Sequence, residues 1–191
     1  MICFMPKSSE SGSMMSPATD LDARVKPLKL MVFDVDGVLT DGSLYYSDTG
    51  AESKAFNAQD GQGIRLLRDA GFKLAIITSR RSTLVERRAR DLGLHYCFQG
   101  VEAKLATFDD ILAELKFAPA QAGYMGDDLL DLPVLLRAGF AATVPHAPAA
   151  LVEHAHFVAS RPAGAGAVRE VCEMILRRQG VLDSLVAEYL R

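Results

Sequence analysis

Short apolar runs alternate with helical stretches from residue 28 to about residue 180, and this alternation constrains the fold more than any other feature. The runs read LKLMVF (28–33), FKLAIITS (72–79), AGYM (122–125), FAATV (140–144) and FVAS (157–160). Continuous apolar runs are typical of strands buried on both faces, and helices between them imply parallel neighbours. The sequence therefore predicts a doubly wound, mostly parallel α/β sheet with helices on both faces.

The length of 191 residues fits one such domain. Residues 1–26 are rich in Ser, Pro and small side chains, so we expect a flexible N-terminal segment there. The domain is expected to cover 27–180, followed by a C-terminal tail at 181–191. The tail is amphipathic, and docking on a neighbouring molecule and disorder remain equal alternatives for it.

One segment interrupts the alternation. Residues 42–56, GSLYYSDTGAESKAF, contain two β-prone halves around Asp48 and Gly50, which suit a turn. We expect a β-hairpin that projects from the loop after the first strand.

The polar residues that could do chemistry follow the strands. Asp34 and Asp36 come after the first strand, Thr78 and Arg80 after the second, and Asp127 after AGYM. Ligands bind outside the carboxyl ends of parallel strands, so these side chains are expected to meet at one edge of the sheet. Carboxylate oxygens without histidine or thiolate partners favour a hard cation, above all Mg²⁺, beside a phosphate.

This arrangement suggests a division of labour. Asp34 is closest to its strand and can attack phosphorus, while Asp36 can protonate the leaving alcohol and then deprotonate water. Mg²⁺ would bridge Asp34, Asp127 and a phosphate oxygen. The remaining contributors are a backbone that can approach the phosphate, a hydroxyl donor and a fixed positive charge: Gly37, Thr78 and Lys104.

The stretches DVDGVLTDG, IITSR, EAKL and GDDLLD resemble, in order and spacing, the four motifs of the haloacid dehalogenase superfamily. The resemblance implies a Rossmann-like core with Asp34 as nucleophile and Asp36 as general acid/base. It implies that Mg²⁺ is held by Asp34, Asp127 and the backbone carbonyl of Asp36. Thr78 and Lys104 would bind phosphate, and the supporting acids would be Asp128 and Asp131.

The chain leaves no room for the cap domain that many of these enzymes carry. From Leu28 to about Gly180 it is similar to the capless 3-deoxy-D-manno-octulosonate 8-phosphate phosphatases. That resemblance implies cytoplasmic homotetramers, assembled through the hairpin (Gly42–Phe56), that serve lipopolysaccharide synthesis. The substrate-binding candidates are Gly37, Lys54, Asp60 and Arg80, with Arg80 and then Lys54 expected to hold the sugar-acid carboxylate.

Two features depart from the pattern of these relatives. Gln59 stands where some relatives have arginine, and Ala163 and Ala165 fall in a loop that is glycine-rich with a polar residue in many of them. These differences weaken any carboxylate contact at position 59 and remove a polar contact from the later loop.

Composition excludes several other classes. The formal net charge of −3 argues against a broad nucleic-acid surface. Three scattered cysteines, Cys3, Cys97 and Cys172, indicate neither a disulfide framework nor a zinc site, so a reducing cytosol is expected. No apolar run approaches the roughly 20 residues that span a membrane.

Four alternatives stay open at this point. A phosphatase for a nine-carbon ulosonate phosphate shares every core motif. A non-catalytic phosphoryl-binding module of the same fold is disfavoured by the intact acids. A signalling receiver domain places its acceptor aspartate after a later strand. A β-phosphoglucomutase-like transfer needs a cap to exclude water.

Overall fold

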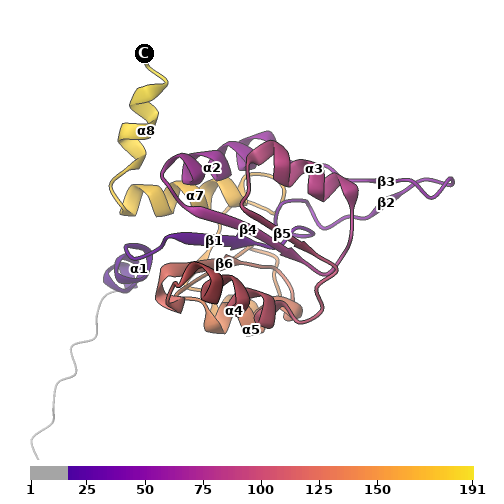
Figure 1. Ribbon diagram of the computed structural model, residues 1–191, viewed down its shortest axis with the longest axis horizontal. Coiled ribbons are helices and arrows are strands. Elements are labelled where there is room, and N and C mark those ends of the chain that lie inside the picture. The colour runs from indigo at the N-terminus through magenta and orange to yellow at the C-terminus, as the bar shows by residue number, and fades with distance from the viewer. Residues whose placement is uncertain (1–16) are drawn as a thin grey trace, which may run out of the picture.

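A computed structural model describes residues 17–191 and shows one parallel sheet between two layers of helices (Figure 1). The six strands of the sheet lie in the order β5-β4-β1-β6-β7-β8. They are β1 (Leu30–Phe33), β4 (Lys73–Thr78), β5 (Tyr96–Gln99), β6 (Ala122–Met125), β7 (Phe140–Thr143) and β8 (Phe157–Val158). The predicted fold class is confirmed.

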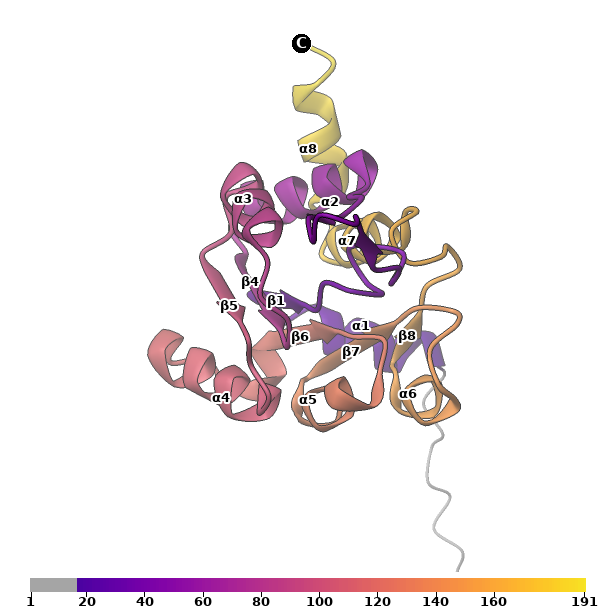
Figure 2. The same cartoon turned by 90° about the vertical axis from the view of Figure 1, so that its right-hand side faces the viewer.

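Helices cover both faces of this sheet (Figure 2). One layer contains α2 (Ala58–Asp69), α3 (Thr83–Leu92) and α7 (Ala167–Arg178), and the other contains α4 (Lys104–Leu115), α5 (Leu132–Arg137) and α6 (Ala149–His154). Each face has its own apolar core. On the first, Phe33 and Ile76 of the strands pack with Ile64 and Val171, and on the second, Val32 packs with Phe108.

The strand order places three functional loops side by side. β1 pairs with β4 on one side and with β6 on the other, so that Phe33 is opposite both Ile76 and Met125. Asp34 continues this alignment by donating its backbone N–H to the Met125 carbonyl at 2.9 Å. After β5 the chain crosses back over β1 to form β6, which makes the β1–β6 boundary a topological switch point.

The expected hairpin is present and projects from the carboxyl edge of the sheet (Figure 1). Its strands are β2 (Tyr45–Tyr46) and β3 (Glu52–Ser53), paired antiparallel with Tyr46 opposite Glu52. Gly50 adopts a positive φ of 80° in the turn, a conformation that suits glycine. The exposed apolar side chains on this hairpin are Leu44, Tyr45 and Tyr46.

The prediction of a flexible segment through residue 26 is wrong for residues 17–25, which form helix α1 (Pro17–Val25). Val25 is fully buried in the core, and Gln179 at the end of α7 donates a hydrogen bond to its carbonyl at 3.0 Å. Asp22 forms an ion pair with Arg178 of the same helix. Propensity alone gives no sign of this docking, because the partners lie at the other end of the chain. Residues 1–16 lie outside the described residues.

The C-terminal tail forms helix α8 (Leu182–Glu188), with Leu182 and Leu185 buried against the domain. The alternative of a disordered tail is therefore wrong for this helix. In Figure 1, α8 lies at the end of the molecule opposite the hairpin.

Two smaller features differ from expectation or add to it. The sequence allows a capping box at the start of α3, with Ser82 or Thr83 as N-cap and Glu86 three residues past Thr83. The N-cap is Ser82, and within residues 17–191 its side chain makes no capping hydrogen bond. Helix α6 was not predicted from the sequence. In the described chain, no helix is long and apolar enough to cross a membrane.

Candidate active site

A buried lysine joins two of the predicted carboxylates. Lys104 is the first residue of α4, and its Nζ lies 2.7 Å from Asp34 Oδ2 and 2.7 Å from Asp131 Oδ1. The Lys104 side chain is only 2% exposed. A cation at a helix N-terminus is opposed by the helix dipole, so the two carboxylates must hold it there.

Asp131 organises the loop that follows β6. Its Oδ2 accepts hydrogen bonds from the backbone N–H groups of Asp127 at 3.0 Å and Asp128 at 3.2 Å. Its Oδ1 also accepts from the Tyr124 hydroxyl at 2.6 Å. This aspartate therefore fixes the position of Asp127, as expected for a supporting acid.

Three carboxylates gather at the end of the central strands. Oxygen atoms of Asp34, Asp127 and Asp131 all lie within 4.8 Å of one another. Asp34 Oδ1 and Asp127 Oδ1 are buried and have no hydrogen-bond partner among the described residues. Two unpartnered carboxylate oxygens at this spacing fit a hard cation such as Mg²⁺.

The crowding of these groups changes their acidity. Burial, with a contribution from Asp131 that Lys104 opposes, raises the pKa of Asp34 to about 6. Burial and the charges of Asp34 and Asp131 raise the pKa of Asp127 to about 7. For Lys104, burial acts to lower the pKa, but the two neighbouring carboxylates outweigh it and raise the pKa above its usual value.

The loop after β1 comes very close to this cluster. Gly37 has a φ of 84°, and a Cβ on it would lie 1.9 Å from Asp127 Oδ2, so only glycine fits. Thr40, which the sequence reasoning missed, holds the loop, since its Oγ1 accepts from the N–H groups of Gly37 at 3.4 Å and Gly42 at 3.3 Å.

The loop after β4 supplies the predicted hydroxyl. Thr78 is buried at the end of that strand, and its carbonyl accepts from the Val101 N–H at 3.1 Å. The carbonyl of Arg80 accepts from the Gly100 N–H at 3.1 Å. These bonds tie the Thr78 loop to the segment that leads into Lys104.

Asp36 contacts the two cations that we expected to bind a carboxylate. Lys54, whose side chain is 1% exposed, forms an ion pair with Asp36 Oδ1. Arg80 Nε lies 3.5 Å from Asp36 Oδ2. Both predicted cations thus lie beside the candidate acid/base.

The carboxylates line an open pocket of about 210 Å³ together with Thr78, Ser79, Arg80 and Lys104. Ligand pockets are usually larger, about 300–1,000 Å³, so a sugar-sized group would extend beyond these walls. A neighbouring cleft of about 290 Å³ shares Asp127 and is also lined by Gly37, His146 and Ala163. The departure at Ala163 therefore lies at the edge of the site.

Asp60, a predicted site residue, and Gln59, a departure from the family pattern, lie away from the carboxylate cluster. The prediction that Asp60 binds substrate disagrees with its position, because this buried carboxylate caps α7 by accepting from the N–H groups of Gly166 at 3.1 Å and Arg169 at 2.8 Å. Gln59 lines a separate, larger polar groove of about 520 Å³ beside Arg161 and Arg169, which contains none of the carboxylate cluster. Asp128 is exposed, and its side chain accepts from the Leu129 N–H at 2.7 Å.

Comparison with known proteins connects this geometry to a family. The chain is 43% identical over 166 residues to the 3-deoxy-D-manno-octulosonate 8-phosphate phosphatase KdsC of Escherichia coli (strain K12), covering 87% of this chain and 88% of the relative. The crystal structure of the Moraxella catarrhalis phosphatase of that name, in complex with magnesium, phosphate and the sugar acid, matches with a TM-score of 0.88. It is 38% identical and covers 90% of this chain and 98% of that one.

The chain belongs to the 3-deoxy-D-manno-octulosonate 8-phosphate phosphatase family. A Legionella pneumophila structure described as a haloacid dehalogenase superfamily hydrolase of subfamily III A is also similar. Its TM-score is 0.88 at 35% identity, covering 91% of this chain and 96% of that one. No protein-family model matches the chain.

Sequence reasoning missed two further contributors to the phosphatase-family site. Tyr124 supports Asp131, and a tyrosine within a buried strand is itself a signal, because its hydroxyl needs a partner. Glu52 contacts both Arg80 and Lys54. The sequence carries no local signal for Glu52, because its contact with Arg80 depends on how the hairpin folds back onto the loop after β4.

The raised pKa values of Asp34 and Asp127 predict a pH-dependent stability effect in the metal-free protein. Because the folded-state pKa of Asp127 lies above its ordinary value of 3.8, its ionisation destabilises the fold fully above about pH 7. The penalty fades as the pH falls through 7 toward 4. Asp127→Asn should therefore raise the thermal midpoint by several degrees at pH 8 in a chelator, and by roughly half as much at pH 5.5.

Differential scanning calorimetry of the two proteins at both pH values measures this effect. Asp110→Asn, which removes an exposed carboxylate from α4, is the matched control and should shift the midpoint little at either pH. An equal shift for Asp127→Asn at pH 8 and pH 5.5 would contradict the raised pKa of Asp127 and its cause in burial and neighbouring charge.

Proposed function

We propose that this chain is a Mg²⁺-dependent phosphatase that hydrolyses 3-deoxy-D-manno-octulosonate 8-phosphate to the free sugar acid and phosphate. The observation that carries the proposal is the buried Asp34, with one oxygen bound to Lys104 and the other without a partner among the described residues. The names and the bound sugar acid of its relatives support the eight-carbon substrate. The product is a precursor for lipopolysaccharide synthesis.

In this proposal one carboxylate oxygen of Asp34 attacks phosphorus while the bond from phosphorus to the sugar oxygen breaks, and the other oxygen stays with the cations beside it. Asp36 donates a proton to that oxygen, so the sugar leaves as a neutral alcohol. Water then attacks the aspartyl phosphate, and Asp36 takes up its proton as phosphate leaves and the Asp34 carboxylate is restored. Lys104 keeps Asp34 ionised and oriented through both steps.

The groups that bind phosphate come from the loops around Asp34. Thr78 can donate its hydroxyl to a phosphoryl oxygen, and the absent side chain at Gly37 allows the backbone N–H groups there to approach it. Asp34, Asp127 and the backbone carbonyl of Asp36 would hold Mg²⁺, whose charge would offset the repulsion between the substrate and the carboxylates. Asp131 and, less directly, Asp128 keep Asp127 in place.

The first test is phosphate release from a panel of esters, with and without Mg²⁺. The panel contains the eight-carbon and nine-carbon ulosonate phosphates and para-nitrophenyl phosphate. We expect Mg²⁺-dependent release with a strong preference for the eight-carbon ester. A preference for the nine-carbon ester would contradict the substrate, and no release from any ester would contradict the reaction.

Asp34→Asn is the control for this assay, because an amide cannot form the aspartyl phosphate. Its turnover should fall by at least about a thousandfold while the circular dichroism spectrum is retained. Residual activity near that of the wild type would contradict Asp34 as nucleophile.

We further propose a cytoplasmic homotetramer assembled through the hairpin, residues 42–56. Supporting this, Leu44, Tyr45 and Tyr46 are 46%, 48% and 60% exposed on an element that projects from the domain. A small open pocket also needs a neighbouring surface to enclose a sugar acid.

A single charge on the hairpin tests this assembly. Leu44→Asp should shift the sedimentation coefficient from that of a tetramer toward smaller species, since a buried charge opposes association. Leu136→Asp, which places the same charge at a 61% exposed position on α5 outside the hairpin, is the control and should leave the coefficient unchanged. A wild-type monomer at micromolar concentration would contradict the proposal.

A further inference from the structure

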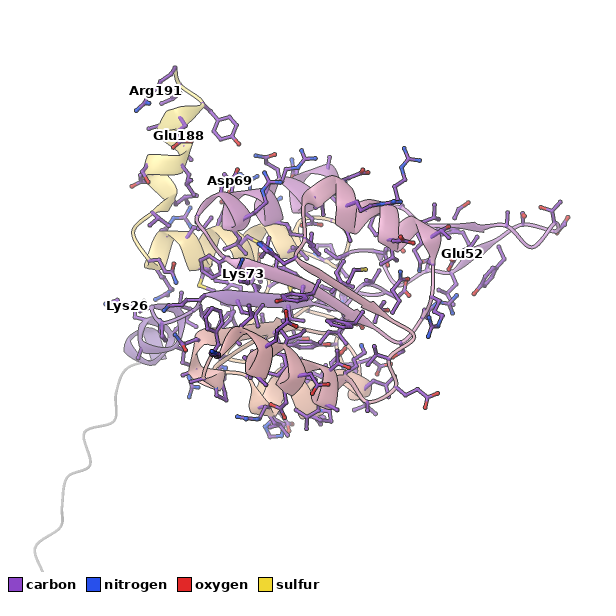
Figure 3. The ribbon with its side chains drawn as sticks, in the orientation of Figure 1. Lys26, Glu52, Asp69, Lys73, Glu188 and Arg191 are labelled. Atoms are coloured by element: carbon purple, nitrogen blue, oxygen red, sulfur yellow. The ribbon has the colours of Figure 1, made fainter. Side chains whose placement is uncertain are left out.

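Glu52 lies between the two cations that face the candidate acid/base. Its Oε1 is 3.2 Å from Arg80 Nη2 and 3.5 Å from Lys54 Nζ. Figure 3 shows Glu52 where the hairpin joins the body of the domain. Glu52 and Asp36 therefore contact the same two cations, and they do so through different nitrogen atoms of Arg80.

The hairpin places Glu52 beside these cations. Glu52 begins β3 and Lys54 directly follows that strand, and the two side chains come together at 3.5 Å. Tyr46 is the cross-strand neighbour of Glu52, and its hydroxyl accepts a hydrogen bond from Arg80. The Arg80 guanidinium also lies 6.0 Å from the centre of the Tyr46 ring. The hairpin thus holds Arg80 from two adjacent positions.

The charges in this cluster balance. Lys54 and Arg80 are matched by Asp36 and Glu52, whose side chains are 18% and 20% exposed. A carboxylate that enters beside the two cations would bring a third negative charge into a half-buried site. Such a ligand must displace one of the resident acids, and Asp36 is held by its place on the loop after β1.

We propose that, in the free enzyme, the carboxylate of Glu52 occupies the position that the carboxylate of the ligand takes. Glu52 must then be displaced from Arg80 and Lys54 when a sugar acid binds. The inference rests on the proposed function and deepens it, since it names the residue that controls carboxylate affinity. When the substrate binds, its phosphate group anchors it in the site, and the carboxylate of the substrate can then replace the carboxylate of Glu52. The product retains only the carboxylate, so the return of Glu52 promotes its release.

The inference predicts that removing the Glu52 charge tightens product binding. The free eight-carbon sugar acid is added as an inhibitor of para-nitrophenyl phosphate hydrolysis by the Mg²⁺-loaded enzyme. In Glu52→Gln, which keeps the size and hydrogen-bonding capacity of the side chain, its inhibition constant should fall about fivefold at low salt. The decrease in the inhibition constant should be smaller at 0.5 M KCl, because the Debye length there is only roughly 4–5 Å and dissolved ions screen the charge of Glu52.

Matched variants separate this effect from general ones. Asp48→Asn removes the same charge from the exposed tip of the hairpin and should leave the inhibition constant unchanged. Glu52→Thr also removes the charge and suits a strand, so it replaces Glu52→Gln if that variant fails to fold. The ratio of kcat/KM for the ulosonate phosphate to that for the aryl phosphate should rise in both Glu52 variants.

An inhibition constant that is unchanged or higher in the Glu52 variants, while ulosonate phosphate is still hydrolysed, overturns this proposal and leaves the proposed function intact. Failure of the wild-type enzyme to release phosphate from any ester overturns the proposed function instead. The two failures are therefore distinguishable in one set of assays.

Discussion

The ammonium group of Lys104 lies between Asp34 and Asp131 in the interior, and the acidic site depends on these two 2.7 Å contacts. A buried carboxylate without a partner takes up a proton, and a protonated Asp34 would have no negative charge with which to attack phosphorus. The same lysine holds Asp131, whose other oxygen fixes the N–H groups that position Asp127. One cation therefore maintains both the charge of Asp34, the proposed nucleophile, and the shape of the loop that carries Asp127.

The sheet determines where this can happen. β1 lies between β4 and β6, so the residues after these three strands converge without any long excursion of the chain. The hairpin then reaches back over the loop after β4 and brings Lys54 and Glu52 to Asp36 and Arg80. In the proposed function, phosphate chemistry thus depends on the rigid edge of the sheet. Recognition of the rest of the ligand depends on the hairpin of β2 and β3 and on the neighbouring subunit proposed to pack against it.

The core and the phosphate-facing residues were predictable because both follow from local rules. Buried parallel strands read as continuous apolar runs, and polar residues directly after them must share one edge, which places Asp34, Thr78 and Asp127 correctly. The failures involve contacts between distant segments. α1 is held at the end of α7 by the hydrogen bond from Gln179 to the Val25 carbonyl. Asp60 caps α7 by accepting from the N–H of Arg169, which is more than 100 residues away in the sequence. The contact of Glu52 with Arg80 likewise depends on how the hairpin folds back, which no local pattern encodes.

The most direct test of this account is to identify the residue that carries phosphate during turnover. The Mg²⁺-loaded enzyme is mixed with excess 3-deoxy-D-manno-octulosonate 8-phosphate, quenched in acid and reduced with borohydride, which converts an aspartyl phosphate to homoserine. Mass spectrometry of the digested protein should then find homoserine at position 34 and at no other aspartate. Modification at Asp36 or Asp127, or steady turnover with no modified residue, would contradict the account.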